Sequence, residues 1–436
     1  MAGEQFTDCI VQDVASPARN ALVGGPFGSD LISKDYVSSG VPVIRGTNMG
    51  HGRWVAGEFA FVTPAKADSL SANCARPGDL VFTQRGTLGQ VALVPSKGSD
   101  RYLISQSQMK LTVDEAKAEA LFLYYVFSSA EQQEYIRQNA IQTGVPHTNL
   151  GILRNTPLTL PSLAEQKAIA AVLGALDDKI ELNRRMNASL EAMARALFQS
   201  WFVDFEPVRA KLDGRQPVGL DPGTASLFPE HLEDSPLGHI PKGWSAQCLP
   251  EAIEVNPRRA LKSGTRAPYL DMNNLPTQGH SAEVVIDREF SSGTKFQNGD
   301  TLLARITPCL ENGKTGYVDF LNDAQVGWGS TEFIVLAPKP PLPPQFGYLL
   351  ARSDALRTHA IQNMTGTSGR QRVPSECFNT FWLAVPPTEI AARFDELTAP
   401  LMAKIQANAL QSRILATLRD TLLPKLLSGE LQPTHI

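Results

Sequence analysis

The chain has 436 residues, of which 42% are apolar and 19% charged, and its formal net charge is −4. This length allows two or three domains, and this composition is typical of a globular protein. The negative net charge argues against a protein coated with basic residues for unspecific nucleic-acid binding, although a local basic face remains compatible with it.

The sequence also indicates the cellular compartment of the protein. The N-terminal residues lack the basic segment and apolar run of a signal peptide, and no apolar stretch reaches the length of a membrane span. The five cysteines form no C-x-x-C pair, which argues against a zinc knuckle or a disulfide framework. We therefore expect a cytoplasmic protein with no membrane contact.

Residues 1–160 are predicted to form a globule of strands and helices. Apolar, strand-like runs such as "VPVIRGTNM" (41–49), "RPGDLVFTQRG" (76–86) and "QSQMKLTVD" (106–114) alternate with Gly- and Pro-rich turns. A Thr-Gly loop, "IQTGVPHT" (141–148), follows them.

A long helix is predicted at 161–205. Ser162 and Glu165 form an S-x-x-E capping box, and no proline interrupts the next forty residues. Apolar residues recur three and four positions apart, which marks one buried stripe that needs a partner helix. The stripe consists of Ile169, Leu173, Leu176, Ile180, Met186, Leu190, Met193, Leu197 and Trp201.

The segment 206–241 contains six Pro and four Gly in 36 residues and is predicted to be a linker without a core of its own. A second globule is then expected at 242–386. Its segments "APYLDMNNL" (267–275), "QNGDTLLARIT" (297–307), "STEFIVLAP" (330–338) and "NMTGTSGRQR" (363–372) correspond in order to those of the first globule. The chain therefore uses the same α+β unit twice.

A second long helix is predicted at 387–430. Shifting the first stripe by 225 residues gives Phe394, Leu401, Ile405, Leu415, Leu418 and Leu422, and it places Asn408 where the first helix has Asn183. A polar residue in such a seam fixes the register of the helices; the alternative is that each Asn merely faces water. Pro400 is expected to kink or break this helix, and Pro424 and Gly429 to end it.

Motifs for catalysis are missing from the sequence. "PCLENGKT" (308–315) has Pro308 where a P-loop needs Gly, and "GHSAE" (279–283) lacks the closing Gly of a nucleophile elbow. We find no metal-ligand spacing and no dinucleotide or amino-methyltransferase fingerprint. We expect neither catalytic nor metal-binding residues in this chain.

The polar residues in loop-like positions are of the types that read DNA base edges, since Arg pairs with guanine and Asn or Gln with adenine. Each of them is individually also compatible with an ordinary surface role. The loop "GTSGRQR" (366–372) is the strongest single candidate. The candidates are Arg45, Thr47, Asn48, Gln84, Arg85, Thr87, Gln106, Gln142 and His147 in the first globule, and Asn273, Asn274, Arg305, Thr307, Thr331, Arg370, Gln371 and Arg372 in the second.

These features together resemble the specificity subunit of type I restriction–modification enzymes over nearly the whole chain. The resemblance rests on the order and the duplication of several segments. They are "GPFGSDL" (25–31), "GDLVFTQRGTLG" (78–89), "LPSLAEQKAIAAVLGALDDKIELN" (160–183), "LFQSWFVDFEPVRAKLDG" (197–214), "SPLGHIPKGW" (235–244) and "LLPKLLSGEL" (422–431). The second copy departs from the pattern, because it has no "GPFGS" stretch and contains Pro400.

The resemblance implies two target-recognition domains separated by two helices that pack as an antiparallel coiled coil. Each domain would read one half of a bipartite double-stranded DNA sequence. The chain itself would bind no cofactor. Modification subunits carrying S-adenosylmethionine would methylate adenine, and restriction subunits using ATP and Mg would translocate and cut DNA. If the helices are antiparallel and of equal length, Asn183 and Asn408 should face each other as a side-chain amide pair.

Two alternatives remain open from the sequence. One is a single-chain methyltransferase or nuclease, which would be active without partners. The other is a coiled-coil scaffold that binds only protein. Sequence-dependent DNA binding in the presence of the modification subunit separates the proposed role from the scaffold.

Overall fold

The structure, a computed structural model, describes residues 6–50, 52–142, 146–282, 284–367 and 369–433. The chain divides into two compact units. Unit 1 consists of residues 1–180 and 413–436, and unit 2 of residues 181–412. Each unit contains one globule, which we call head 1 (1–160) or head 2 (242–386), together with parts of the two long helices α5 (Leu163–Phe198) and α11 (Thr388–Leu427).

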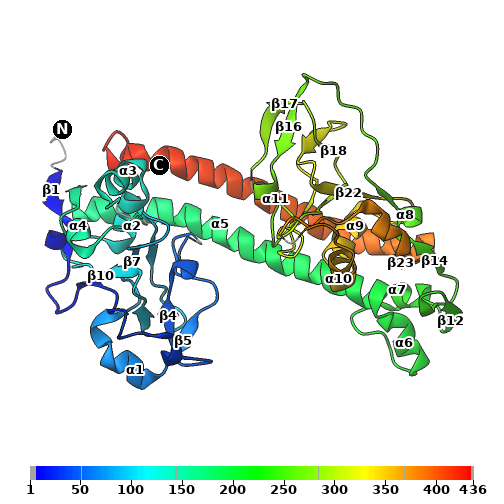
Figure 1. The fold of residues 1–436 in the computed structure, drawn as a ribbon, viewed down its shortest axis with the longest axis horizontal. Helices are drawn as coiled ribbons and strands as arrows, with labels where there is room; N and C mark the ends of the chain where they lie inside the picture. The colour runs from blue at the N-terminus through cyan, green and yellow to red at the C-terminus, as the bar shows by residue number, and fades with distance from the viewer. Residues whose placement is uncertain (1–5, 51, 143–145, 283, 368, 434–436) are drawn as a thin grey trace. The chain divides into compact units, whose positions relative to one another are not determined.

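Head 1 is built from two sheets and a closing strand pair (Figure 1). One sheet is antiparallel, with the order β2-β10-β7-β8: Leu22–Gly24, Gln108–Leu111, Leu80–Thr83 and Val91–Leu93. The other has the order β3-β5-β4-β9-β6, with β4 and β9 parallel: Tyr36–Val37, Ala60–Val62, Val41–Ile44, Tyr102–Ile104 and Cys74–Ala75. The strands β1 (Thr7–Ile10) and β11 (Pro157–Leu160) pair and bring the two ends of the head together. Its helices are α1 (Pro64–Ser69), α2 (Ala120–Ser128), α3 (Ala130–Asn139) and α4 (Leu150–Arg154).

Head 2 repeats this topology. Its antiparallel sheet has the order β15-β22-β19-β20: Ile253–Val255, Phe333–Pro338, Thr301–Ala304 and Thr315–Tyr317. The second sheet has the order β17-β16-β21-β18, with β16 and β21 parallel: Ile286–Glu289, Arg266–Leu270, Gly327–Gly329 and Thr294–Phe296. The closing pair is β14 (Ser245–Cys248) with β23 (Trp382–Val385), and the helices are α8 (Leu249–Ala252), α9 (Pro344–Ala351) and α10 (Asp354–Gln362). The duplication expected from the sequence is confirmed, except that among the described strands β3 of head 1 has no counterpart in head 2.

The segment 206–241 is more ordered than a linker. It forms α6 (Glu206–Leu212), α7 (Pro222–Leu227) and the hairpin β12 (Leu232–Ser235) with β13 (Gly238–Pro241). Val208, Phe228 and Ile240 are buried in the core of unit 2. The expectation of a linker was therefore wrong, because its few apolar residues are spaced so that they reach an existing core rather than build a separate one.

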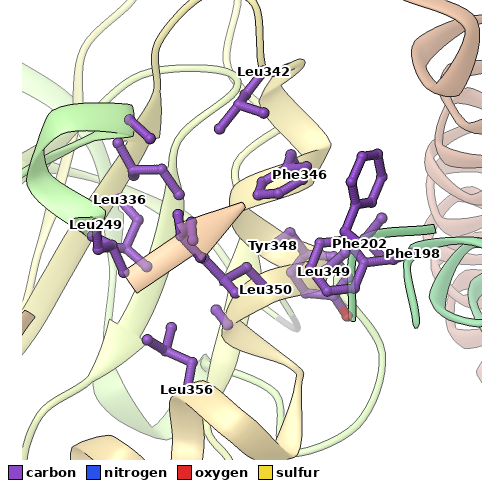
Figure 2. Packing of buried hydrophobic residues seen from close by; sticks show 14 of the residues in the cluster. Phe198, Phe202, Leu249, Leu336, Leu342, Phe346, Tyr348, Leu349, Leu350 and Leu356 are labelled. Atoms are coloured by element: carbon purple, nitrogen blue, oxygen red, sulfur yellow. The ribbon is translucent and has the colours of Figure 1, made fainter. Parts of the chain in front are cut away.

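Aromatic residues connect α5 to head 2. After α5, residues Gln199–Val203 continue as a π-helix. Figure 2 shows Phe198 and Phe202 beside Phe346 of α9, with ring centroids 5.0 and 5.1 Å from that of Phe346. All three rings are buried, and burial of an aromatic side chain contributes about 1.5–3 kcal/mol. This packing fixes head 2 to the end of the helix.

The two long helices agree with the predicted bounds in most respects. The Ser162 hydroxyl accepts a hydrogen bond from the Glu165 amide (3.3 Å), as a capping residue should. Pro400 does not break α11, which continues through it and through Pro424 to Leu427. A proline removes one helical N–H and costs about 3 kcal/mol, which the buried neighbours Phe394, Met402 and Ile405 can offset by packing.

The stripe is buried to different degrees. Ile169, Leu173, Asn183, Trp201, Phe394, Ile405 and Asn408 are buried, and Leu176, Ile180, Met186, Leu190, Leu197, Leu401, Leu415 and Leu422 are half-buried. Met193 and Leu418 are exposed (55% and 43%), so their assignment to the stripe was wrong. A pair of helices buries only a narrow seam, and residues at its margin remain in contact with solvent.

Asn183 and Asn408 meet in this seam, which runs antiparallel within unit 2. The Asn183 amide donates to the Asn408 carbonyl (3.4 Å), and the Asn187 amide four residues later donates to the Ile405 carbonyl (3.2 Å). The expected pairing of the two amides with each other was wrong. Asn183 instead donates to Ser412 (3.2 Å), and Asn408 to Asn187 (2.8 Å).

These two hydrogen bonds are equivalent in the repeat, since the shift of 225 residues converts Asn183 to Asn408 and Asn187 to Ser412. The centre of the repeat therefore lies between these bonds, near Arg185 and Leu410, about two residues from the position that equal helix lengths predicted. Asn183 also donates to Gln411 (2.9 Å), whereas its Oδ1 has no partner among the described residues.

We expect Asn408→Ala to lower the free energy of unfolding of unit 2 by ~1–3 kcal/mol. The substitution removes the side-chain amide that donates to Asn187 Oδ1 and leaves this oxygen in the seam without its hydrogen bond. Chemical denaturation followed by circular dichroism measures this change. Lys404→Ala, at an exposed position of the same helix, is the matched control and should change stability by less than ~0.5 kcal/mol. Equal stability of the two variants would show that the seam amides contribute nothing.

Candidate nucleic-acid interface

Parallel strands bring polar segments together at one edge of each head. In head 1, β4 and β9 end side by side, so Arg45 and Ser105 follow at the same edge, where the Ser105 amide donates to the Ile44 carbonyl (2.9 Å). In head 2, β16 and β21 end together in the same way. The segments with Asn273 and Thr331 follow these two strands.

Three loops of head 1 are joined by backbone hydrogen bonds. The Gln84 amide donates to the Ser107 carbonyl (2.6 Å), and the Thr148 amide donates to the Gln84 carbonyl (3.0 Å). His147 and Ile141 exchange two backbone bonds of 3.1 and 2.8 Å. We call this arrangement the loop cluster of head 1 (84–87, 105–107 and 141–148, of which 143–145 lie outside the described residues).

Head 2 repeats the same arrangement. The Arg305 amide donates to the Glu332 carbonyl (2.9 Å), and the Val373 amide donates to the Arg305 carbonyl (2.8 Å). Arg372 and Thr365 exchange two backbone bonds of 2.8 and 2.9 Å. The loop cluster of head 2 (305–308, 330–332 and 365–373, of which residue 368 lies outside the described residues) therefore has the same framework with different side chains.

Arg45 and Gln106 lie beside a surface depression of about 490 Å³ in head 1. The side-chain amide of Gln106 donates to the Leu31 carbonyl (2.9 Å) and so connects the loop after "GPFGS" to the loop cluster. Gly25 approaches Ser105 so closely that a Cβ would lie 2.0 Å from the Ser105 carbonyl oxygen, so only glycine fits there. The depression combines the half-buried Arg45 with the exposed side-chain amide of Gln106.

Asn48 is not available to read DNA, which corrects its assignment as a candidate. Its side chain is buried, accepts from the Arg45 amide (3.0 Å) and donates to the carbonyls of Ala56 (3.0 Å) and Glu58 (2.9 Å). It holds the loop after β4 in place. The remaining head 1 candidates lie at the surface: Thr47, Arg85, Thr87 and Gln142 are exposed, and Gln84 and His147 are half-buried.

Arg372 is held by an acidic partner in head 2. Its Nε and Nη2 atoms donate to the Glu332 carboxylate at 2.7–3.0 Å, and this pairing raises the pKa of Arg372 above its usual value. Arg370 on the same loop is exposed. Its backbone amide donates to the Thr367 carbonyl and its carbonyl accepts from Arg372 Nη1 (3.4 Å), whereas its guanidinium makes no hydrogen bond with another described residue. Arg370 is therefore the better placed of the two arginines for contact with DNA.

The other head 2 candidates divide into structural and accessible groups. Thr307 and Gln371 are linked, because the backbone amide of Gln371 donates to the Thr307 hydroxyl (3.1 Å). The Lys314 ammonium donates to the Asn273 carbonyl (3.1 Å) and thereby stabilises the loop after β16. Asn274 and Arg305 are half-buried, and Asn273 and Thr331 are exposed.

Sequence reasoning missed two residues at these edges. Phe27 of "GPFGS" is 82% exposed and directly precedes Gly28, which lines the head 1 depression, and Glu332 pairs with Arg372 in head 2. The glycines around Phe27 were a usable signal, since they indicate a tight loop that presents its one large side chain. Nothing in the sequence indicated the Glu332 pair, whose members are 40 residues apart.

Within the residues that the structure describes, no group of three or more His, Cys, Asp or Glu side chains could hold a metal ion. No described helix is long and apolar enough to cross a membrane.

Comparison with known proteins gives a family match over part of the chain and similar relatives over most of its length. Residues 37–192 match the family model described as the type I restriction modification DNA specificity domain. The chain is 24% identical to the type I restriction enzyme MjaIX specificity subunit of Methanocaldococcus jannaschii, over 94% of this chain and 91% of the relative. It is 23% identical to the HindI specificity subunit of Haemophilus influenzae, over 82% of this chain and 87% of the relative. Its fold is similar to the crystal structure of a type I restriction–modification S subunit from M. genitalium (TM-score 0.56, 16% identity, covering 98% and 97% of the two chains).

Proposed function

We propose that this chain is a specificity subunit of a type I restriction–modification enzyme and that each head reads one half of a bipartite double-stranded DNA target, because residues 37–192 match the DNA specificity domain and specificity subunits are similar to the chain over most of its length. The chain is a recognition component rather than an enzyme. The observation that carries the proposal is the shared framework of the two loop clusters. Gln84 of head 1 is equivalent to Arg305 of head 2, and His147 of head 1 is equivalent to Arg372 of head 2. The two heads therefore present different hydrogen-bonding groups on the same backbone framework.

The proposal includes the partners of the chain. Modification subunits carrying S-adenosylmethionine would dock on α5 and α11 and methylate adenine, and restriction subunits would supply ATP- and Mg-dependent translocation and cleavage. Exposed apolar side chains on the two helices support a docking role: Leu182, Met193, Leu410, Ile414 and Leu418. The net charge of −4 is compatible with DNA binding if these partners contact much of the phosphate backbone.

The test is binding of the assembled methyltransferase to duplexes in which every base pair of the target is changed in turn. The proposal predicts two separate groups of sensitive positions with an insensitive spacer between them. A single continuous group of sensitive positions, or binding without sequence preference, would contradict it.

We expect Arg370→Ala to weaken specific binding through the second half-site. Loss of a bidentate base contact costs ~1–3 kcal/mol of discrimination at one base pair. Loss of a phosphate contact would instead weaken all sequences alike and lower the salt slope by about 1. Titrations against single-base variants at two salt concentrations distinguish these cases.

Arg215→Ala is the control for this experiment. Arg215 lies in the 206–241 segment, is also exposed and pairs with Asp213 and Glu206. If Arg370→Ala and Arg215→Ala bind every duplex as the unchanged protein does, Arg370 has no part in DNA contact.

A further inference from the structure

A buried tyrosine joins head 1 to α5. The Tyr125 hydroxyl on α2 donates to Asp177 Oδ2 (2.6 Å), and Arg419 on α11 donates to the other carboxylate oxygen of Asp177 (2.7 Å). Tyr125 is 2% exposed and Asp177 is half-buried, so this bond is partly buried. We call these three residues the head 1 lock.

Head 2 contains a similar group. The Tyr348 hydroxyl on α9 donates to Glu191 Oε1 on α5 (2.6 Å) and accepts from Arg352 Nε (3.2 Å). Tyr348 belongs to the same buried core cluster of unit 2 as Phe198 and Phe202 (Figure 2), and it is fully buried. Arg352 is held in turn by the carbonyls of Thr277 (2.7 Å) and Thr315 (2.8 Å). Tyr348, Glu191 and Arg352 form the head 2 lock.

Both locks depend on a protonated tyrosine hydroxyl. Burial raises the pKa of Tyr125 and of Tyr348 well above the usual value, so both hydroxyls stay protonated at neutral pH. Each hydroxyl therefore donates to a carboxylate, and hydrogen bonds to charged groups are about twice as strong as neutral ones. A tyrosine ring that is packed on all sides and bonded at its tip leaves the head little freedom to turn on α5.

We propose that the two locks are positioning elements, which hold each head at a fixed angle on α5 and thereby make the protein discriminate the spacer length of its DNA target. This inference rests on the proposed function. Both carboxylates, Asp177 and Glu191, lie on α5, so the helix that would define the spacer also carries the attachment point of each head.

The geometry of DNA gives the reason why an angle matters. One additional base pair moves a half-site by about 3.4 Å and rotates it by about 35° around the duplex axis. A head that can turn follows this rotation, whereas a head that is held does not. Removing a lock should therefore improve binding to wrong spacers more than it changes binding to the right one.

The experiment uses Tyr125→Phe and Tyr348→Phe, singly and together, in the full chain assembled with its modification subunits. Binding is measured to duplexes with the same half-sites and with spacers from two base pairs shorter to two longer. We expect discrimination against the neighbouring spacer lengths to fall by about three- to tenfold for each variant, the scale set by the net contribution of one hydrogen bond. Discrimination between bases within the half-sites should not change.

Matched controls are available in each head. Tyr124→Phe on α2 and Tyr317→Phe on β20 also remove partly buried hydroxyls, and among the described residues neither hydroxyl bonds to α5. Both should keep the discrimination of the unchanged protein. Glu191→Gln retains an acceptor for the Tyr348 hydroxyl and should keep most of the discrimination between spacer lengths.

The outcomes separate the two proposals. If the lock variants discriminate spacers as sharply as the unchanged protein, or lose affinity equally for every spacer, the locks are merely structural and the inference is wrong. If the unchanged complex shows no dependence on spacer length or on bipartite sequence, the proposed function itself fails.

Discussion

Replacing residues 1–160 with the corresponding region of a related specificity subunit should change one half of the DNA target and leave the other half as it was. The structural reason is that β1 and β11 pair at the junction, from Thr7 with Leu160 to Ile10 with Pro157. The head is thus closed on itself before α5 begins at Leu163. The affinity for the original half-site should fall toward the unspecific level, a loss on the order of 10³-fold or more.

The measurement is a map of methylated adenines produced by the hybrid complex. Replacing 242–386 serves as the reciprocal control and should change the other half, because β14 and β23 close head 2 in the same way. A hybrid in which both halves change together would show that the heads do not read independently. The donor head should retain a residue equivalent to Tyr125, which bonds to Asp177 on α5, and the core residue Leu173 stays in place because it lies on α5, outside the replaced segment.

Inserting four residues after Arg185 and four after Leu410 should lengthen the preferred DNA spacer by one or two base pairs. Four helical residues add about 6 Å and about 40° of rotation. One base pair adds about 3.4 Å and about 35°. The two sites are equivalent in the repeat, so the inserted segments would face each other. The bonds from Asn183 to Ser412 and from Asn408 to Asn187 would lie on either side of them and remain intact.

The spacer preference of this variant is measured with the same series of duplexes, and the half-site preference should not change. An insertion after Arg185 alone is the contrasting variant. It leaves α11 one turn too short to cover the seam, so we expect loss of stability rather than a new spacer. If the double insertion keeps the original spacer preference, the paired helices do not set it.

Local patterns were sufficient for most of the fold. The capping residue Ser162, the stripe that includes Ile169 and Ile405, and the Gly-Asp turns before β7 and β19 all describe contacts between residues near one another in sequence. The duplication was visible for the same reason, because equivalent segments keep their order and spacing. Pro400 was misjudged, since a local rule cannot include the buried neighbours that hold α11 together.

The sequence by itself determined that this protein consists of two similar α+β heads and two long helices with an Asn at the same place in each seam. Only the tertiary structure decided which polar residues are available at the surface. Asn48 is used internally by Ala56 and Glu58, Arg372 is paired with Glu332, and Tyr348 is bonded to Glu191, which lies 157 residues away. The physical reason is that a polar side chain has a fixed number of donors and acceptors. Where partners distant in sequence already bond to them, they are no longer available to a ligand. Residue type gives the chemistry a side chain can perform, whereas its neighbours in space decide whether that chemistry remains available.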